Sequence, residues 1–241
     1  MCILAVALRA HPSAPLIVAA NRDEALDRPA TPPRRWGGFV AGRDEVGGGT
    51  WLGFTDSGLF VGLTNLWWSD HRRRRPRSRG EVVTTLLSAD TLAGAERALR
   101  SLSISEYGRF NVICATRDGR GFAAGASDRL HLMPLSAGVF VVSNLLPGEP
   151  WSKTEQVHAD VTDAIGAPID RLPAALAGRL SRVTDGGSPQ QSACVITEHN
   201  YGTVSSTILL AGGASEVLRF ADGRPDRTPF HDYSALLAQR T

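Results

Sequence analysis

Short apolar runs alternate with turn residues over the first part of the chain. Residues 3–8 and 16–20 are almost wholly apolar, and the segment between them, His11 to Pro15, contains two prolines. This pattern predicts two strands joined by a hairpin. A second hairpin is predicted over residues 51–65, because Asp56-Ser57-Gly58 separates two further apolar runs.

Apolar residues at helical spacing follow this β-rich part. In residues 80–87 and 92–102 the apolar side chains recur three and four positions apart, which predicts two helices. A later helix is expected to open at Trp151, because Pro150 directly precedes it. Residues 160–165 and 172–180 are expected to be helical as well.

The other apolar runs are predicted to be strands. They are residues 110–116 paired with 121–126, residues 129–134 in a hairpin with 138–143, and the closing strands 190–197, 205–210 and 216–220. Residues 29–36, which contain three prolines, are expected to form a surface loop. Strands and helices come in separate groups, without regular βαβ alternation, which favours an α+β architecture of antiparallel sheets and segregated helices. With no repeat or linker in sight, residues 1–241 are expected to form one domain.

The composition of the chain argues against several classes of function. The formal net charge is +2, which argues against a general affinity for nucleic acid. The longest apolar runs are too short to span a bilayer, and no segment has the pattern of a secretory signal peptide. The cysteines are Cys2, Cys114 and Cys194, a sparse and odd set that favours a reducing, cytoplasmic location. Cys114 and Cys194 lie in apolar runs and are expected to be buried, unreactive thiols.

Candidate chemistry is concentrated at the amino terminus, where Cys2 follows the initiator methionine. If Met1 is removed, Cys2 carries both a thiol and a free α-amine, which is a nucleophile with its own base. An α-amine has a pKa of about 8, so near neutral pH a useful fraction can accept the thiol proton and later return it to a leaving amine. The alternative is that Cys2 is only the small apolar start of an edge strand.

A polar cluster, Arg22-Asp23-Glu24, ends the second predicted strand. A hairpin brings the ends of its strands together, so a cation and carboxylates are expected beside Cys2. A nearby arginine favours the thiolate form of a cysteine. The alternative for Arg22 and Asp23 is a structural ion pair.

An arginine-rich run, residues 71–79, follows the adjacent Trp67 and Trp68. A solvated loop is the simplest interpretation of such a charge run. The functional alternative is an anion-binding flap beside a pocket, because arginines bind phosphates and carboxylates bidentately. In that case Trp67, Trp68 and Arg79 are candidate ligand-binding residues.

Short motifs are spread in order over nearly the whole chain. They are Met1-Cys2, Asn21-Arg22-Asp23-Glu24, Arg28-Pro29, Gly48-Gly49-Thr50-Trp51-Leu52-Gly53, Thr64-Asn65, Arg79-Gly80-Glu81, Ser143-Asn144, Pro150-Trp151-Ser152-Lys153 and Tyr201-Gly202-Thr203. Together they resemble the NRDE family, which takes in the transport and Golgi organisation protein 2 homologues. That family is thought to be related to N-terminal nucleophile hydrolases, so the resemblance implies a four-layer αββα fold with two stacked antiparallel sheets.

The resemblance also implies a set of site residues. The nearest enzymes with an N-terminal cysteine are the cholylglycine hydrolases and penicillin V acylases, whose positions correspond here to Cys2, Arg22, Asp23, Asn65 and Asn144. The amides of Asn65 and Asn144 would donate to the oxyanion of a tetrahedral intermediate, unless they only cap strand ends. The spacing of Arg22 and Asp23 differs from the enzymes' pattern, and their late active-site arginine has no counterpart that we can place.

Two functions of different classes follow from these residues. The first is hydrolysis of a linear amide through a Cys2 thioester after removal of Met1, a reaction that needs no cofactor. The second is non-catalytic binding or trafficking of haem or an acyl-CoA-like amphipathic anion. In that case Trp36, Trp67 and Trp68 would form apolar walls, the arginine run would bind the acidic groups, and Cys2 or His71 would ligate the iron.

Overall fold

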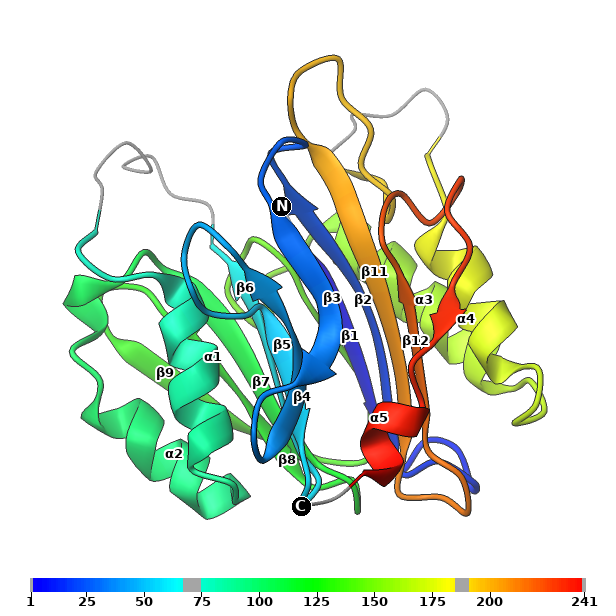
Figure 1. Cartoon of the computed structure of the whole chain (residues 1–241), viewed down its shortest axis with the longest axis horizontal. Coiled ribbons are helices and arrows are strands. Elements are labelled where there is room, and N and C mark those ends of the chain that lie inside the picture. Colours follow the sequence, from blue (N-terminus) through cyan, green and yellow to red (C-terminus); the bar gives the residue numbers. More distant parts are fainter. Residues whose placement is uncertain (1, 67–74, 185–190, 240–241) are drawn as a thin grey trace.

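Two antiparallel sheets lie face to face and helices cover both outer faces (Figure 1). The computed structural model describes residues 2–66, 75–184 and 191–239. The six-stranded sheet contains, in spatial order, β10 (Gly138–Val142), β1 (Ile3–Leu8), β2 (Leu16–Glu24), β11 (Gly202–Ala211), β12 (Val217–Ala221) and β13 (His231–Asp232). The seven-stranded sheet contains β3 (Ala30–Arg35), β4 (Phe39–Asp44), β5 (Leu52–Thr55), β6 (Leu59–Asn65), β7 (Phe110–Thr116), β8 (Gly121–Ala126) and β9 (Leu130–Leu135).

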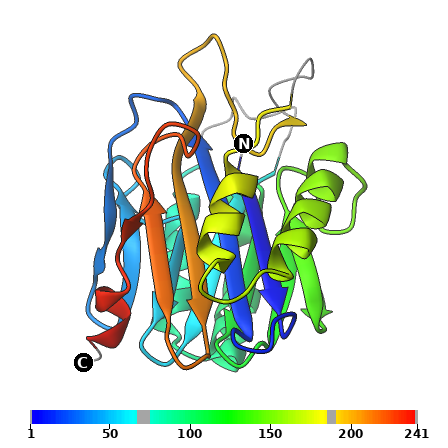
Figure 2. The same ribbon diagram turned by 90° about the vertical axis from the view of Figure 1, so that its right-hand side faces the viewer.

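The helices divide between the two sheets. They are α1 (Arg79–Ser88) and α2 (Leu92–Ser101) on the seven-stranded sheet, and α3 (Ser152–Ile165) and α4 (Leu172–Leu180) on the six-stranded sheet. Figure 2 shows α3 and α4 lying side by side in front of the strands that they cover. A 3₁₀ turn (Ile104–Glu106) and the short α5 (Ala235–Ala238) complete the described elements. Within the described ranges, no helix has both the length and the apolar composition to cross a bilayer.

Three apolar clusters fill the three interfaces between the four layers. On β1 the side chains of Leu4, Val6 and Leu8 pack between the two sheets, whereas Ile3 and Ala5 pack toward α3 and α4. Successive side chains of a strand point to opposite faces, and both faces of this strand are covered. This explains why the run 3–8 is apolar throughout rather than alternating. The third cluster lies between the seven-stranded sheet, α1 and α2.

The four-layer αββα architecture that the family resemblance implies is confirmed. The first hairpin is also as predicted, with Ile3 opposite Asn21 and Leu8 opposite Leu16. The predicted helix over 172–180 has the bounds expected, and those over 80–87 and 92–102 differ by one residue at each affected end. The pieces expected from Trp151 and over 160–165 are one continuous helix, α3.

The surface loop expected over residues 29–36 is wrong, because residues 30–35 form β3. β3 is an edge strand of its sheet and has a hydrogen-bonded neighbour on one side only. A proline, which lacks the N–H group, is tolerated where that group would point away from the neighbour. The pairing register also shifts between Thr31 and Arg34, so Pro32 and Pro33 lie in an irregular part of the ladder. Proline therefore did not exclude a strand here.

The hairpin expected over residues 129–143 is also wrong. β9 pairs with β8 in one sheet, whereas β10 pairs with β1 in the other. Gly138 has a φ of +135°, which favours glycine, where the chain passes from one sheet to the other. Two adjacent apolar runs predict strands but do not show which sheet each one joins.

The strand expected over residues 190–197 is not formed by its described part, residues 191–197. That segment makes one isolated bridge, from Ile196 to Gly202. Its backbone is held instead by single contacts, from Cys194 N to the Arg182 carbonyl (3.0 Å) and from Val195 N to Thr203 Oγ1 (2.8 Å).

Candidate active site at the amino-terminal strand

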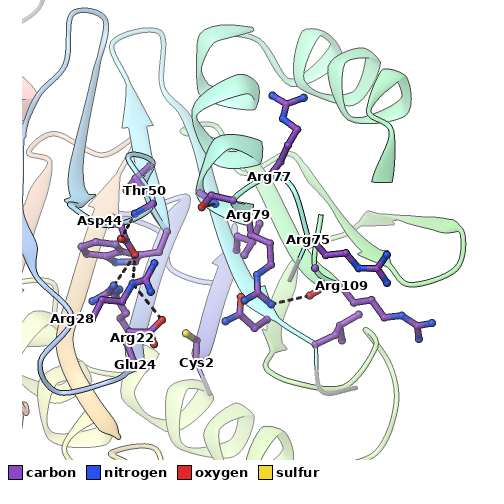
Figure 3. A pocket seen from close by; sticks show the side chains of 18 of the residues that line it. Cys2, Arg22, Glu24, Arg28, Asp44, Thr50, Arg75, Arg77, Arg79 and Arg109 are labelled. Atoms are coloured by element: carbon purple, nitrogen blue, oxygen red, sulfur yellow. Dashed lines mark hydrogen bonds and ion pairs between the residues drawn. The ribbon is translucent and has the colours of Figure 1, made fainter. Parts of the chain in front are cut away.

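A cavity of about 580 Å³ opens at the end of the sandwich where β1 begins and β2 and β6 end. Cys2 lines it, and so do Arg22, Asp23 and Asn65, three of the residues predicted from the sequence. Figure 3 shows the sulfur of Cys2 pointing into this space, with Arg22, Arg28 and Asp44 on one side and Arg79 and Arg109 on the other.

Strand pairing places Cys2 on the cavity wall. Ile3 is paired with Asn21, so Cys2 lies alongside the end of β2, and its Sγ is 3.8 Å from the Asp23 carbonyl oxygen. Cys2 is half-buried. Burial raises the pKa of the Cys2 thiol, and the Asp23 carboxylate adds to this, while the positive charge of Arg22 opposes it. The thiol therefore needs a base to become a nucleophile.

The end of β2 sends alternate side chains to opposite faces of its sheet. Val18 and Ala20 face the other sheet, so Arg22 and Glu24 follow on that face. Ile17 and Ala19 face the helices, and so do Asn21 and Asp23. The four consecutive polar residues 21–24 therefore point alternately toward the other sheet and toward the helices.

Asn21 holds the helix side of the site together. Its Nδ2 donates to the carbonyl oxygens of Leu180 (2.9 Å) and Ala193 (2.8 Å), and its Oδ1 accepts from Ser206 Oγ (2.6 Å). These bonds tie the end of α4 and the irregular segment around Ala193 to the six-stranded sheet.

Arg22 crosses to the other sheet. Its guanidinium donates to Asp44 Oδ2 (3.0 Å) and lies 4.6 Å from the ring centroid of Trp51. Arg28 binds the same Asp44 oxygen (2.8 Å). Burial alone raises the pKa of Asp44, but the hydrogen bonds from Arg28 and Gly47 and the charges of both arginines hold it below its ordinary value. A structural ion pair between Arg22 and Asp23 was the alternative considered from the sequence, and in the structure Arg22 forms its ion pair with Asp44 in β4.

Asp23 is buried among polar groups on the helix side. Its Oδ1 accepts from Thr203 Oγ1 (2.6 Å), and its Oδ2 lies 3.6 Å from Lys153 Nζ. Tyr201 donates its hydroxyl to the Asp23 carbonyl (2.9 Å). Burial raises the pKa of the Asp23 carboxyl, against the opposing charge of Lys153.

The two predicted asparagines lie together. Asn144 is buried, and its Nδ2 donates to the backbone carbonyl of Asn65 (2.6 Å). Asn65 lines the cavity. Next to them, Ser143 Oγ donates to the Cys2 carbonyl, and Asn111 Nδ2 donates to the carbonyl of Ser143 (3.0 Å). The ends of β6 and β10 are therefore held against the start of β1.

Arginines form one wall of the cavity. Arg75, Arg77, Arg79 and Arg109 all line it. Arg77 pairs with Glu81 (2.9 Å) and Arg109 with Asp128 (2.5 Å), whereas the described residues provide no ion-pair partner for Arg79. Burial lowers the pKa of the Arg79 guanidinium. The wall presents a concentrated positive charge to the space in front of Cys2.

The other candidate ligand-binding residues are three tryptophans and a histidine. Trp67, Trp68 and His71 lie outside the described residues. Trp36 does not line the cavity but stacks on Phe39. Among the described residues, Trp51 is the tryptophan that lines the cavity.

Sequence reasoning did not single out Trp51, Asp44 or Lys153 as site residues. Trp51 and Lys153 belong to motifs that carry the family resemblance, and this was a usable signal. No such signal marks Asp44, because its role depends on a side-chain contact between strands of two different sheets. The other two thiols are buried, as expected. Burial raises the pKa of both, that of Cys194 to about 11. Among the described residues, no three His, Cys, Asp or Glu side chains are grouped to hold a metal ion.

Comparison with known proteins agrees with this sequence pattern. The family model for Transport and Golgi organisation 2 matches residues 1–222. The chain belongs to this family. The Transport and Golgi organization protein 2 homolog of Homo sapiens is 30% identical over 235 residues, which cover 84% of each chain. The homolog of Bos taurus is 34% identical over 149 residues, 57% of this chain, and in that match the chain spans about half (53%) of its relative.

Solved structures of N-terminal nucleophile hydrolases share the fold of this Transport and Golgi organisation 2 family member. The Caenorhabditis elegans ortholog of N-acylethanolamine-hydrolyzing acid amidase has a TM-score of 0.58 and 13% identity, covering 88% of this chain and 94% of its own. A single-residue variant of the conjugated bile acid hydrolase from Clostridium perfringens has a TM-score of 0.58 and 9% identity, covering 97% of this chain and 96% of its own. At these identities the likeness concerns the fold alone, and it confirms the N-terminal nucleophile hydrolase-like architecture.

Proposed function

We propose that this protein is an N-terminal cysteine hydrolase that cleaves a linear amide after removal of Met1. The observation that supports this most is the position of the Cys2 thiol on the wall of a large cavity at the start of β1. A nucleophile must be reachable by its substrate, and the two other cysteines are buried in the core. Such a thiol must stay reduced, so we place the activity in the cytoplasm.

The proposed reaction begins with the α-amine of Cys2 accepting the thiol proton. The thiolate attacks the amide carbon, and the C–N bond breaks as the protonated α-amine returns its proton to the leaving amine. Water then hydrolyses the Cys2 thioester, which releases the acid and restores the thiol. Because burial raises the pKa of this thiol, an attached base is needed near neutral pH.

Each neighbouring group has a proposed part in this scheme. Asp23 orients the α-amine, and Arg22 contributes positive charge that favours the thiolate. Asn65 lies on the cavity wall and is proposed to bind the oxyanion. Asn144 is buried and does not line the cavity, and it donates one N–H group of its amide to the Asn65 carbonyl, so its proposed part is to fix the position of Asn65.

The test is amine release from two probes, an N-acylethanolamide and a glycine-conjugated bile acid, by a chain shown by intact mass to begin at Cys2. We expect release, together with an acyl adduct on Cys2 in quenched samples, and loss of both in Cys2→Ala. Cys114→Ala, which removes a buried thiol of β7 that does not line the cavity, is the matched control and should retain both. Retention of Met1 in every preparation, or equal release by Cys2→Ala, would contradict the proposal.

The arginine wall favours a second candidate, non-catalytic binding of an amphipathic anion. Arg79 faces the cavity with no ion-pair partner in the described part of the chain, which suits a carboxylate or phosphate. Haem is one such ligand, with its propionates on the arginines. The thiol of Cys2 fits its iron less well, because burial disfavours the thiolate.

Two titrations test the binding proposal. We expect palmitoyl-CoA to bind and quench tryptophan fluorescence. Arg79→Met should bind it about tenfold more weakly, because this variant loses a single charged contact worth about 1.4 kcal/mol. Arg97→Met removes an exposed arginine of α2 and should bind as the wild type does. Haem should give a Soret shift that either Cys2→Ala or His71→Ala abolishes, and a shift that neither variant changes would contradict the haem version. Absence of quenching and of a Soret shift would exclude both ligands.

A further inference from the structure

Lys153 is the only lysine in a chain with 26 lysines and arginines in total. Its side chain is completely buried, at 0% exposure, in the first turn of α3. It does not line the cavity. A lysine in this place cannot serve as a surface charge, so its position calls for another explanation.

Two electrostatic effects oppose a cation at this position. Burying an ammonium group is strongly unfavourable unless a countercharge accompanies it. The first turn of a helix is also the positive end of its dipole, where a cation is repelled. The structure provides a countercharge in Asp23, 3.6 Å away, and the ring of Trp151 lies 5.8 Å from the ammonium nitrogen.

This buried pair connects α3 to the nucleophile strand. Asp23 follows the alternation of β2 and so faces the helices, while its backbone carbonyl is in contact with the thiol of Cys2. Thr203 in β11 fixes one carboxylate oxygen, and Lys153 lies against the other. A change in the charge of Lys153 therefore acts first on Asp23 and only then on Cys2.

We propose that Lys153 is a positioning residue: it keeps the Asp23 carboxylate ionised, so that Asp23 can hold the α-amine of Cys2 in place. This inference rests on the proposed function, because it gives Asp23 the task of orienting that amine. The direction of the effect follows from burial. Burial favours a neutral Asp23, and the charge of Lys153 opposes this.

Other charged and polar groups lie near Asp23 and Cys2, and they must be the same in every variant that is compared. Arg22 and Glu24 lie on the opposite face of β2, where Arg22 binds Asp44. Arg79 faces Cys2 across the cavity, and the charges of the two groups interact. Tyr201 contacts the backbone of Asp23 rather than its carboxylate. The variants below leave all of these in place.

The experiment measures the pKa of the α-amine in a chain that begins at residue 2. In a Cys2→Ser background, which removes the competing thiol, trace acetylation with acetic anhydride is followed at several pH values in the tryptic peptide ending at Arg9. Since Lys153 is the sole lysine, Lys153→Met leaves the α-amine as the only amine to label. We expect its pKa to fall by about one pH unit in Lys153→Met, because a neutral Asp23 no longer stabilises the ammonium form.

A double substitution distinguishes action through Asp23 from a direct or merely structural effect. In an Asp23→Asn background, Lys153→Met should leave the pKa of the α-amine unchanged. Lys153→Arg, which keeps the charge, should restore the wild-type value. If Lys153→Met is not folded by circular dichroism, Lys153→Gln replaces it, with the same expected result. An unchanged or raised pKa in the single variant, or an equal shift in both backgrounds, would overturn the proposal.

A control and a second readout separate this inference from the proposed function. Arg182→Met breaks the ion pair of Arg182 with Asp160, another residue of α3, and should not alter the α-amine titration. The titration needs no substrate. A shift without any hydrolysis would support the role of Lys153 and reject the hydrolase, whereas hydrolysis with no shift would do the reverse.

Discussion

Four neighbouring residues at the end of β2 do four different things. Asn21 ties α4 to the sheet, Arg22 reaches Asp44 in the other sheet, Asp23 pairs with Lys153, and Glu24 accepts from the next backbone N–H. The alternation of a strand is what divides them between two layers. At this scale, the sequence predicted that Cys2, Arg22 and Asp23 would meet, because a hairpin joins their strands. It did not predict which partner each charged group takes.

The pH dependence of thiol alkylation tests the residue-scale picture of Cys2. In the chain that keeps Met1, we expect the iodoacetamide rate at Cys2 to rise with a midpoint above about 8.5, since burial raises the pKa of this thiol. After removal of Met1, the ammonium lies on Cys2 itself and the midpoint should fall. Peptide mass spectrometry distinguishes Cys2 from the buried thiols. Identical midpoints in the two forms would show that the amine does not act on the thiol.

At the scale of elements, α1 and the loop after β4 fit together through their backbones. The first turn of α1 is capped by Ser78, whose hydroxyl accepts from Gly80 N while Glu81 accepts from Ser78 N. Gly49 packs directly on Gly80, and Thr50 N donates to the Gly80 carbonyl (3.4 Å). This close approach sets where Arg79 enters the cavity.

Gly49→Ala should therefore be strongly unfavourable. A Cβ atom at Gly49 would lie 2.3 Å from the carbonyl carbon of Gly80, and backbone on both sides leaves it no easy escape. We expect the free energy of unfolding to fall by about 2 kcal/mol, measured by urea denaturation. Gly38→Ala is the control, because no atom lies within 4 Å of its added Cβ. Equal stability of the two variants would mean that the contact is not tight in solution.

Sequence patterns performed unevenly for elements. Helices with regular apolar spacing and the hairpins over residues 3–20 and 51–65 were predicted well, because both depend on local interactions. β3 was missed because Pro32 and Pro33 were taken to exclude a strand. β9 and β10 were wrongly joined, because the choice of sheet depends on contacts with distant strands.

At the scale of the whole molecule, polar contacts join the two sheets at the cavity end. Asp44 in one sheet binds Arg22 from the other. On the opposite side of Cys2, Thr64 Oγ1 donates to the Ser143 carbonyl (2.5 Å). Between these contacts and the far end, the interface is apolar. The four-layer fold was predictable from the family resemblance, whereas these cross-sheet contacts required the structure.

Acid should weaken the Asp44 contact. The pKa of Asp44 is held below its ordinary value in the folded chain, so its contribution to stability is present above about pH 4 and is lost as pH falls further. We expect Asp44→Asn to be less stable than the wild type at pH 6, with a difference that narrows at pH 3. Urea denaturation at both pH values measures it, with Asp222→Asn as the control, because Asp222 is an exposed carboxylate for which the described residues provide no ion-pair partner. A constant difference would contradict this linkage.

The order of strands leaves β10 at one edge of its sheet, with no partner on its outer side among the described residues. By contrast, the edge strand β3 of the other sheet contains prolines, which disfavour pairing with another chain. β10 reads Gly-Val-Phe-Val-Val and has neither a charge nor a proline to block another chain. Val139 and Val141 are covered by the helix side of the core. When that cover loosens, during heating or slow refolding, β10 is where we expect molecules of this protein to begin to self-associate and aggregate.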